Sequence, residues 1–261
     1  MTKKTGSLVA VGTGMMLGAQ ISPIAKSEIM QADKLFSLVD GIAEKWLEQL
    51  SPHLESLQSS YAVGRFRPDS YREMVERVMA AVRAGQRVCL AAYGHPGIFA
   101  CVPHWAIEAA RAEGYEARME PGISADACLY ADLGLDPGSL GCQSYEATHY
   151  MLYRQNVNPY ALLILWQVGL SGETSFTRFE SDPARLSLLI EKLMADGYGP
   201  DHEVIIYEAA TLALMPVRAD RLPLSALPHA TLSPISTLVI PPLGNAPKDD
   251  AMRARLDALA G

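Results

Sequence analysis

The chain contains 261 residues, of which 49% are hydrophobic and 20% are charged, and its formal net charge is −7 at pH 7. This composition excludes a largely disordered chain and suits either one large domain or two lobes that share a core. The negative charge disfavours nucleic acid and anionic membranes as partners, since both require a basic surface. No apolar run reaches about 18 residues, so we predict no membrane span.

The first half of the chain alternates short β-rich runs with helical patterns. In chain order we predict a strand at Ser7–Val11, a helix at Ser22–Gln31, a strand at Lys34–Val39, a helix at Asp40–Leu50, a short helix from Ser51-Pro52, a helix at Asp69–Ala84 capped by Asp69, a strand at Arg87–Ala92, a helix at Pro103–Glu113, a strand at Ala117–Met119 and a helix at Ser124–Leu133. This alternation predicts a parallel sheet with crossover helices.

The second half contains more strands and fewer crossover helices. We predict strands at Tyr160–Val168, His202–Tyr207 and Ser236–Ile240, a helix at Pro183–Asp196, and a charged helix or tail over residues 249–260. The pattern changes near residues 143–158, which suggests two lobes. We therefore expect an α/β protein with an N-terminal lobe at residues 1–145, including a helix-rich segment at about 40–84, and a C-terminal lobe with a mixed sheet at residues 146–261.

The sequence offers no pattern for a metal or a nucleotide. The four cysteines form no CxxC pair and lie among apolar or small residues, which is typical of buried thiols in a reducing cytoplasm. The histidines are scattered, so we expect no metal centre. The segment "AVGTGMMLG" has the wrong glycine spacing for a dinucleotide-binding loop, and the phosphate-binding pattern GxxxxGK[ST] is absent.

Three glycine-containing loops follow predicted strands. They are "AVGTG" after the first strand, "YGHPGIF" after the strand at Arg87–Ala92, and "EPGISA" before the helix at Ser124. Glycine lets the backbone approach a ligand closely, and the carboxyl edge of a parallel sheet is where such folds bind ligands. His95 in the second loop is a lone histidine, which is more often a loop or ligand contact than a catalytic base.

Taken together, these loops resemble those of the tetrapyrrole methylases, which are class III S-adenosylmethionine-dependent methyltransferases. His95 stands where that family usually has aspartate. This difference, together with "EGYEARMEPGISAD", "ADLGLDP", "GCQSYEAT" and "ILWQVG", resembles the borosin peptide backbone α-N-methyltransferases over roughly residues 6–244. The resemblance implies a two-lobed tetrapyrrole methylase fold.

The resemblance also implies a site for S-adenosylmethionine, with S-adenosylhomocysteine as the product. The residues expected to contact the cofactor are Tyr93, His95, Ile98 and Phe99 of the second loop, Ser124, Ala125 and Asp126 at a helix start, and Gln167, Pro242 and Leu243 near the adenosine. No other cofactor is implied.

The segment "SSYAVGRFRPDSYREM" supplies the expected catalytic residues. Tyr61, Arg67 and Tyr71 match the tyrosine-arginine-tyrosine set of the borosin enzymes, although Gln58 replaces a further family tyrosine. An amide nitrogen is a poor nucleophile because its lone pair is delocalised into the carbonyl. Arg67 would hold the amide oxygen, Tyr71 would accept or relay the proton, and Tyr61 would orient the amide. Arg65 is the alternative cation, and a solvated polar segment is the alternative to a site.

The resemblance further implies an interlocked homodimer, in which the helix-rich segment at about 40–84 clasps the partner. Because no apolar core peptide follows the last predicted strand, we expect a separate precursor peptide as the substrate, one for each subunit. Two other functions remain open. They are a small-molecule methyltransferase acting on a tetrapyrrole or corrinoid, and a non-catalytic module that binds S-adenosylmethionine or a peptide.

Overall fold

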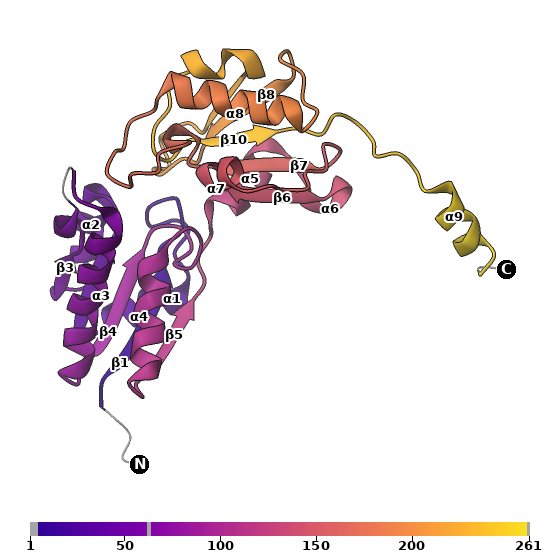
Figure 1. Cartoon of the computed structure of the whole chain (residues 1–261). Helices are drawn as coiled ribbons and strands as arrows, with labels where there is room; N and C mark the ends of the chain where they lie inside the picture. The colour runs from indigo at the N-terminus through magenta and orange to yellow at the C-terminus, as the bar shows by residue number, and fades with distance from the viewer. Residues whose placement is uncertain (1–4, 62–63, 260–261) are drawn as a thin grey trace. The chain divides into compact units, whose positions relative to one another are not determined.

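The structure is a computed structural model that describes residues 5–61 and 64–259. The chain divides into two compact units (Figure 1). Unit 1 comprises the residues up to Leu135 together with Glu173–Phe179 and Glu208–Arg218. Unit 2 comprises Asp136–Gly172, Glu180–Tyr207 and the residues from Ala219 onward.

Unit 1 is built on a five-stranded parallel sheet with the strand order β3-β2-β4-β1-β5. Its elements are β1 (Ser7–Gly12), α1 (Pro23–Met30), β2 (Lys34–Leu38), α2 (Gly41–Glu48), β3 (Leu54–Ser56), the 3-10 helix η1 (Gln58–Ser60), α3 (Arg67–Arg83), β4 (Arg87–Ala92), α4 (Cys101–Ala112), β5 (Glu116–Glu120) and α5 (Ala125–Leu133). The expected parallel sheet with crossover helices is therefore confirmed.

Helices cover both faces of this sheet because successive side chains of a strand point to opposite faces. In β1, Leu8 and Ala10 pack with α3 and α4, whereas Val9 and Val11 pack with α1 and α2. All four side chains are buried. This double coverage leaves the loops at the carboxyl edge as the part of the unit that is free to bind ligands.

Two predictions in this unit are wrong. Ser51-Pro52 begins no helix, because the chain continues as the edge strand β3, whose Leu54 pairs in parallel with Leu35 of β2. Pairing with the sheet outweighs the local Ser-Pro signal. Asp69 is not the cap of α3, which begins at Arg67 after Phe66, so that Asp69 lies in the first turn and binds Arg72 at 2.8 Å.

Unit 2 contains most of a second, mixed five-stranded sheet with the order β6-β7-β10-β8-β9. The strands are β6 (Cys142–Glu146), β7 (Leu162–Trp166), β8 (Glu203–Glu208), β9 (Arg218–Pro223) and β10 (Thr237–Ile240). Strand β6 pairs with β7 in parallel, whereas β10 is antiparallel to β7 and β8. The helices are α6 (Pro137–Leu140), α7 (Ala147–Leu152), η2 (Val168–Leu170), α8 (Pro183–Ala195), η3 (Leu224–His229) and α9 (Asp250–Asp257). Within the described ranges, no helix is long and apolar enough to cross a membrane.

Candidate active site

The three glycine loops meet at the carboxyl edge of the parallel sheet. A Cβ atom built on Gly122 would lie 2.2 Å from the carbonyl oxygen of Gly94 and 2.7 Å from Cα of Gly12. Gly14 and Gly94 also exchange backbone hydrogen bonds of 3.2 and 2.9 Å. Only glycine fits such contacts, so the loops after β1, β4 and β5 form one joined structure. We call Gly12, Gly94 and Gly122 the glycine junction.

The second loop is held by its own histidine. The backbone N–H of Gly97 donates to Nδ1 of His95 at 2.9 Å, which leaves the proton of the neutral ring on Nε2. Next to it, Ile98 and Phe99 are about half exposed, and Phe99 adopts a left-handed φ of 51°. Such a conformation is costly for a bulky residue and is found mainly where function requires it. The loop therefore presents apolar side chains from a constrained backbone.

The third loop ends in the start of α5. Ser124 is the N-terminal cap residue of this helix by position, but its hydroxyl group bonds to the carboxylate of Asp126 rather than to a backbone N–H. Asp126 also accepts from the N–H of Ala127 at 2.8 Å. Ala125 is the first residue of the helix. The three residues predicted here thus lie together at the start of one helix. Gly122 of the glycine junction precedes them in the same loop.

An aromatic cluster links the second loop to α3. The rings of Tyr61 and Tyr71 meet edge to face with their centroids 6.0 Å apart, and Trp105 of α4 lies 6.3 Å from Tyr71 in the same geometry. Tyr93 acts electrostatically on Tyr61, and Tyr71 acts on Tyr93, which places the second loop next to this pair. The structure therefore brings together two of the predicted catalytic residues with a predicted cofactor contact.

The tyrosine hydroxyl groups of this cluster are neutral at physiological pH. Burial raises the pKa of Tyr61 and of Tyr93, and the nearby Tyr71 raises both further. For Tyr71, burial and the neighbouring Cys101 raise the pKa, while the charge of Arg67 and a hydrogen bond from Tyr61 act in the opposite direction. Of these three tyrosines, Tyr71 is therefore the one whose neighbours favour the ionised form, although its pKa remains above the ordinary value.

Arg67 lies in an enclosure of acidic and aromatic groups. Its guanidinium group is 3.4 Å from the carboxylate of Glu173 and 5.4 and 5.3 Å from the ring centroids of Phe176 and Phe179. Only 13% of the Arg67 side chain is exposed, compared with 37% for Arg65. The two arginines predicted as alternatives therefore occupy different environments, and Arg67 is the one whose charge acts on Tyr71.

Arg65 has a different partner. It pairs with Glu73 at 2.7 Å and donates to the carbonyl of Ser60 at 3.2 Å. Ser60 also donates to Glu73 and accepts from Arg77, both at 2.9 Å. This network ties the turn before Tyr61 to helix α3, so Arg65 acts as a structural clamp.

Sequence reasoning missed Glu173, Phe176, Phe179 and Trp105. The first three belong to a loop that leaves unit 2 at Gly172 and returns at Glu180, and they are more than a hundred residues from Arg67 in the chain. The only local signal is a charged residue soon after the buried strand β7, in the motif "SGETSF". Trp105 lay inside a predicted helix with nothing to distinguish it from core.

The remaining predicted cofactor residues lie in unit 2. Gln167 precedes η2 with a left-handed φ of 55°, a conformation that is rare for residues other than glycine. The N–H of Leu243 donates to the carbonyl of Pro159 at 2.9 Å, and Pro242 is its neighbour in the chain. These residues thus sit in constrained turns at the ends of β7 and β10.

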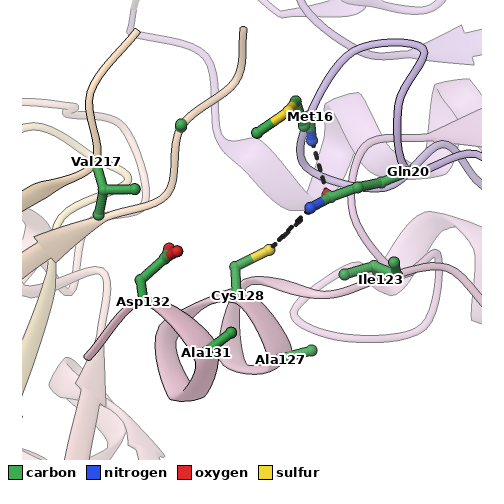
Figure 2. Close-up of a pocket in the computed structure, with 9 residues that line it drawn as sticks. Met16, Gln20, Ile123, Ala127, Cys128, Ala131, Asp132 and Val217 are labelled. Atoms are coloured by element: carbon green, nitrogen blue, oxygen red, sulfur yellow. Dashed lines mark hydrogen bonds between the residues drawn. The ribbon is translucent and has the colours of Figure 1, made fainter. Parts of the chain in front are cut away.

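Unit 1 contains one further feature beside the third loop, a pocket of about 340 Å³ (Figure 2). Figure 2 shows Gln20 reaching across it, where its amide oxygen accepts from the N–H groups of Met15 and Met16 and its amide nitrogen lies 3.6 Å from Sγ of Cys128. The pocket is lined by Met16, Gln20, Ile123, Ala127, Cys128, Ala131, Asp132, Ala210 and Val217. Across residues 5–61 and 64–259, no three His, Cys, Asp or Glu side chains are grouped to hold a metal.

Known proteins resemble this chain in sequence. A relative from Gymnopus fusipes, the "Methyltransferase/ribosomally synthesized cyclic peptide gymnopeptides precursor gymMA1", is 39% identical over 99% of this chain and 62% of its own length. A relative from Coprinopsis marcescibilis, the "Methyltransferase/ribosomally synthesized type I borosin cyclic peptide precursor cmaMA", is 36% identical over 98% of this chain and 67% of its own length. The chain thus spans about three fifths to two thirds of these relatives.

The fold and a family match agree with these relatives. A uroporphyrin-III-C-methyltransferase from Thermus thermophilus has a TM-score of 0.65 at 17% identity, covering 95% of this chain and 99% of its own, which shows a shared fold. Residues 7–221 match the family described as "Tetrapyrrole (Corrin/Porphyrin) Methylases". The chain therefore belongs to the tetrapyrrole methylase family, in the borosin-type branch represented by its fungal relatives.

Proposed function

We propose that this protein transfers a methyl group from S-adenosylmethionine to backbone amide nitrogens of a peptide. The observation that carries the proposal is the position of Arg67, a nearly buried cation whose charge acts on Tyr71 beside the second glycine loop. The names of the fungal relatives, which join a methyltransferase to a cyclic-peptide precursor, support a peptide as the substrate.

The residues of unit 1 fit the proposed cofactor. The glycine junction lets the loops after β1, β4 and β5 pack against one another, and on the second of these loops the half-exposed Tyr93, Ile98 and Phe99 offer apolar contacts. Nε2–H of His95 and the polar groups at the start of α5 supply hydrogen bonds. We propose that Gln167, Pro242 and Leu243 of unit 2 complete the contacts. When bound, S-adenosylmethionine supplies an electrophilic methyl group on a sulfonium.

The protein residues act on the amide. Arg67 donates to the carbonyl oxygen, where negative charge gathers as the N–H proton leaves, and Tyr71 takes up that proton. Tyr61 donates its hydroxyl to Tyr71, which favours the ionised form of Tyr71 that accepts the proton. Bound S-adenosylmethionine would supply the methyl group to the amide nitrogen, and its thioether would be the leaving group. The surrounding aromatic rings exclude water and strengthen these interactions.

We further propose that the peptide is a separate precursor and that the chain forms an interlocked homodimer with one peptide for each subunit. Exposed Ile42 and Phe66, within the segment at about 40–84, support a partner surface there. Among the described residues the cysteines form no disulfide, and this supports a cytoplasmic location, which we also propose.

The test is methylation in vitro. Purified protein is incubated with S-adenosylmethionine and short synthetic peptides, and mass spectrometry records methyl additions on the peptide and on the protein itself. Methylated peptide supports a separate substrate, whereas methylation of the protein alone would contradict that part. Light scattering gives the number of subunits, and a monomer that is active would contradict the dimer.

Variants test the residue roles. Arg67→Ala and Tyr71→Phe should each lower kcat by about 100-fold or more, in line with the loss of a transition-state donor or a general base. Arg65→Ala should retain most of the activity, because Arg65 lies apart from the aromatic enclosure and the turn before Tyr61 keeps its hydrogen bonds with Arg77. Wild-type rates in Arg67→Ala or Tyr71→Phe would refute the assignment of the site.

A further inference from the structure

Glu173, Phe176 and Phe179 of the loop Glu173–Phe179 contact Arg67, and this loop groups with unit 1, although the chain on either side of it belongs to unit 2. We propose that Glu173 is a positioning residue, which holds the Arg67 guanidinium in the orientation required for methyl transfer. This inference rests on the proposed function and deepens it, because it names the group that prepares the cation before the peptide binds.

Three kinds of contact connect the loop to Arg67. The backbone N–H of Arg67 donates to the carbonyl of Phe176 at 3.1 Å, so the loop also fixes the start of α3. The rings of Phe176 and Phe179 contact the guanidinium group, and the Glu173 carboxylate binds Nη2. Phe176 has a left-handed φ of 58°, a strained conformation that the surrounding contacts must support.

Glu173 is itself fixed before it binds Arg67. Its side chain is 3% exposed, and its Oε1 accepts from the N–H of Ser175 at 2.9 Å and from the Ser175 hydroxyl group. Burial alone would raise the pKa of Glu173, but the hydrogen bonds from Ser175 and Arg178 and the charge of Arg67 outweigh it and lower the pKa. Oε1 is thus occupied by the loop, while Oε2 faces Arg67.

This arrangement leaves part of the guanidinium group available. Across the described residues, only Nη2 of the Arg67 side chain has a hydrogen-bond partner, so the N–H groups of Nε and Nη1 can donate to a substrate oxygen. An arginine side chain without its carboxylate samples many rotamers, and it loses this freedom when it is fixed again. Because Glu173 already fixes the Arg67 side chain in the folded enzyme, that freedom is not lost when the peptide binds.

The experiment compares Glu173→Ala, Glu173→Gln and Glu173→Asp with the matched control Glu180→Gln, which removes an exposed carboxylate just beyond the same loop. We expect Glu173→Ala to lower kcat by about tenfold or more with KM for the peptide changed by less than about threefold. Glu173→Asp should restore part of kcat, and the control should match the wild type. Circular dichroism identifies any variant that fails to fold, in which case Glu173→Gln replaces Glu173→Ala.

A double-mutant cycle separates positioning from a general structural role. If Glu173 acts through Arg67, then Glu173→Ala should cost nothing further in an Arg67→Ala background. Losses that multiply in the double variant, or a wild-type kcat in Glu173→Ala, would overturn the inference. If the wild type methylates no peptide, the proposed function fails instead.

A second measurement does not depend on activity. Arg67, and not Glu173, is the charge that acts on Tyr71, so displacement of Arg67 should raise the pKa of Tyr71. Phenolate absorbance is titrated in Glu173→Ala and in the unsubstituted protein, each corrected with its own Tyr71→Phe counterpart. An unchanged Tyr71 titration in folded Glu173→Ala would show that Arg67 keeps its position without Glu173, and the inference would fail.

Discussion

The substitution Gly122→Ala tests the glycine junction most directly. The added Cβ would lie 2.2 Å from the carbonyl oxygen of Gly94, whereas ordinary contacts begin at 3.4 Å, so the two loops must separate by 3.4 − 2.2 = 1.2 Å. Both neighbouring groups are backbone and cannot rotate away. Overpacking of this kind costs about 1–3 kcal/mol, and we expect the upper end because Gly12 blocks the other side at 2.7 Å.

Two assays measure the outcome of Gly122→Ala. Thermal unfolding should show a loss of about 2–4 °C for each kcal/mol of destabilisation. Calorimetric titration should show weaker binding of S-adenosylmethionine. A misplacement of about 1 Å costs a reacting group about 100-fold in rate, and we expect a loss of affinity of about the same size.

The matched control is Gly41→Ala at the start of α2, where no atom lies within 4 Å of the added Cβ. This variant should keep the wild-type melting temperature and affinity. The reasoning would be refuted if Gly122→Ala were as stable as the wild type and bound the cofactor equally well.

Three further predictions concern charges and pH. Because burial and Cys101 raise the pKa of Tyr71, kcat/KM should rise with pH beyond pH 8 and flatten in Tyr71→Phe; a maximum at neutral pH would contradict this. Burial alone would raise the pKa of the Glu28 carboxylate, but Arg87 and Arg118 outweigh it and lower the pKa, so the stabilisation exists above the ordinary value near 4.3 and is lost as the pH falls through the folded-state pKa. Glu28→Gln should be less stable than the wild type at pH 7, and urea titrations should find that this difference shrinks as the pH falls below the ordinary value. Arg77→Ala should lower kcat by releasing the turn before Tyr61, whereas the exposed Arg83→Ala should not, and equal rates would refute the clamp.

Local sequence signals were sufficient to predict a helix end where the backbone groups at that end bond to residues of the same segment. Ser22 caps α1 through a hydrogen bond to the N–H of Ala25, as its Ser-Pro sequence predicts. Gly85, with a φ of 86°, follows the C-terminal cap residue of α3, a position where glycine is common. The edge strand β3 could not be predicted from residues 52–56, because it exists only by pairing with β2.

The same division applies to the candidate site. Tyr61, Arg67 and Tyr71 are close in the chain, so their spacing and the resemblance to a known family were enough to select them. Their environment was not predictable, because burial keeps the pKa of Tyr71 above its ordinary value although the charge of Arg67 acts to lower it. Desolvation depends on every neighbour, and most neighbours are distant in sequence.

The sequence by itself determined the alternation of strands and helices, the three glycine loops and the family to which the chain belongs, because these depend on residue type and short spacing. Only the tertiary structure decided that the loops interlock through Gly12, Gly94 and Gly122, and that Glu173 closes on Arg67 from 106 residues away. Contacts of that kind join segments that are distant in the sequence, so no local pattern encodes them.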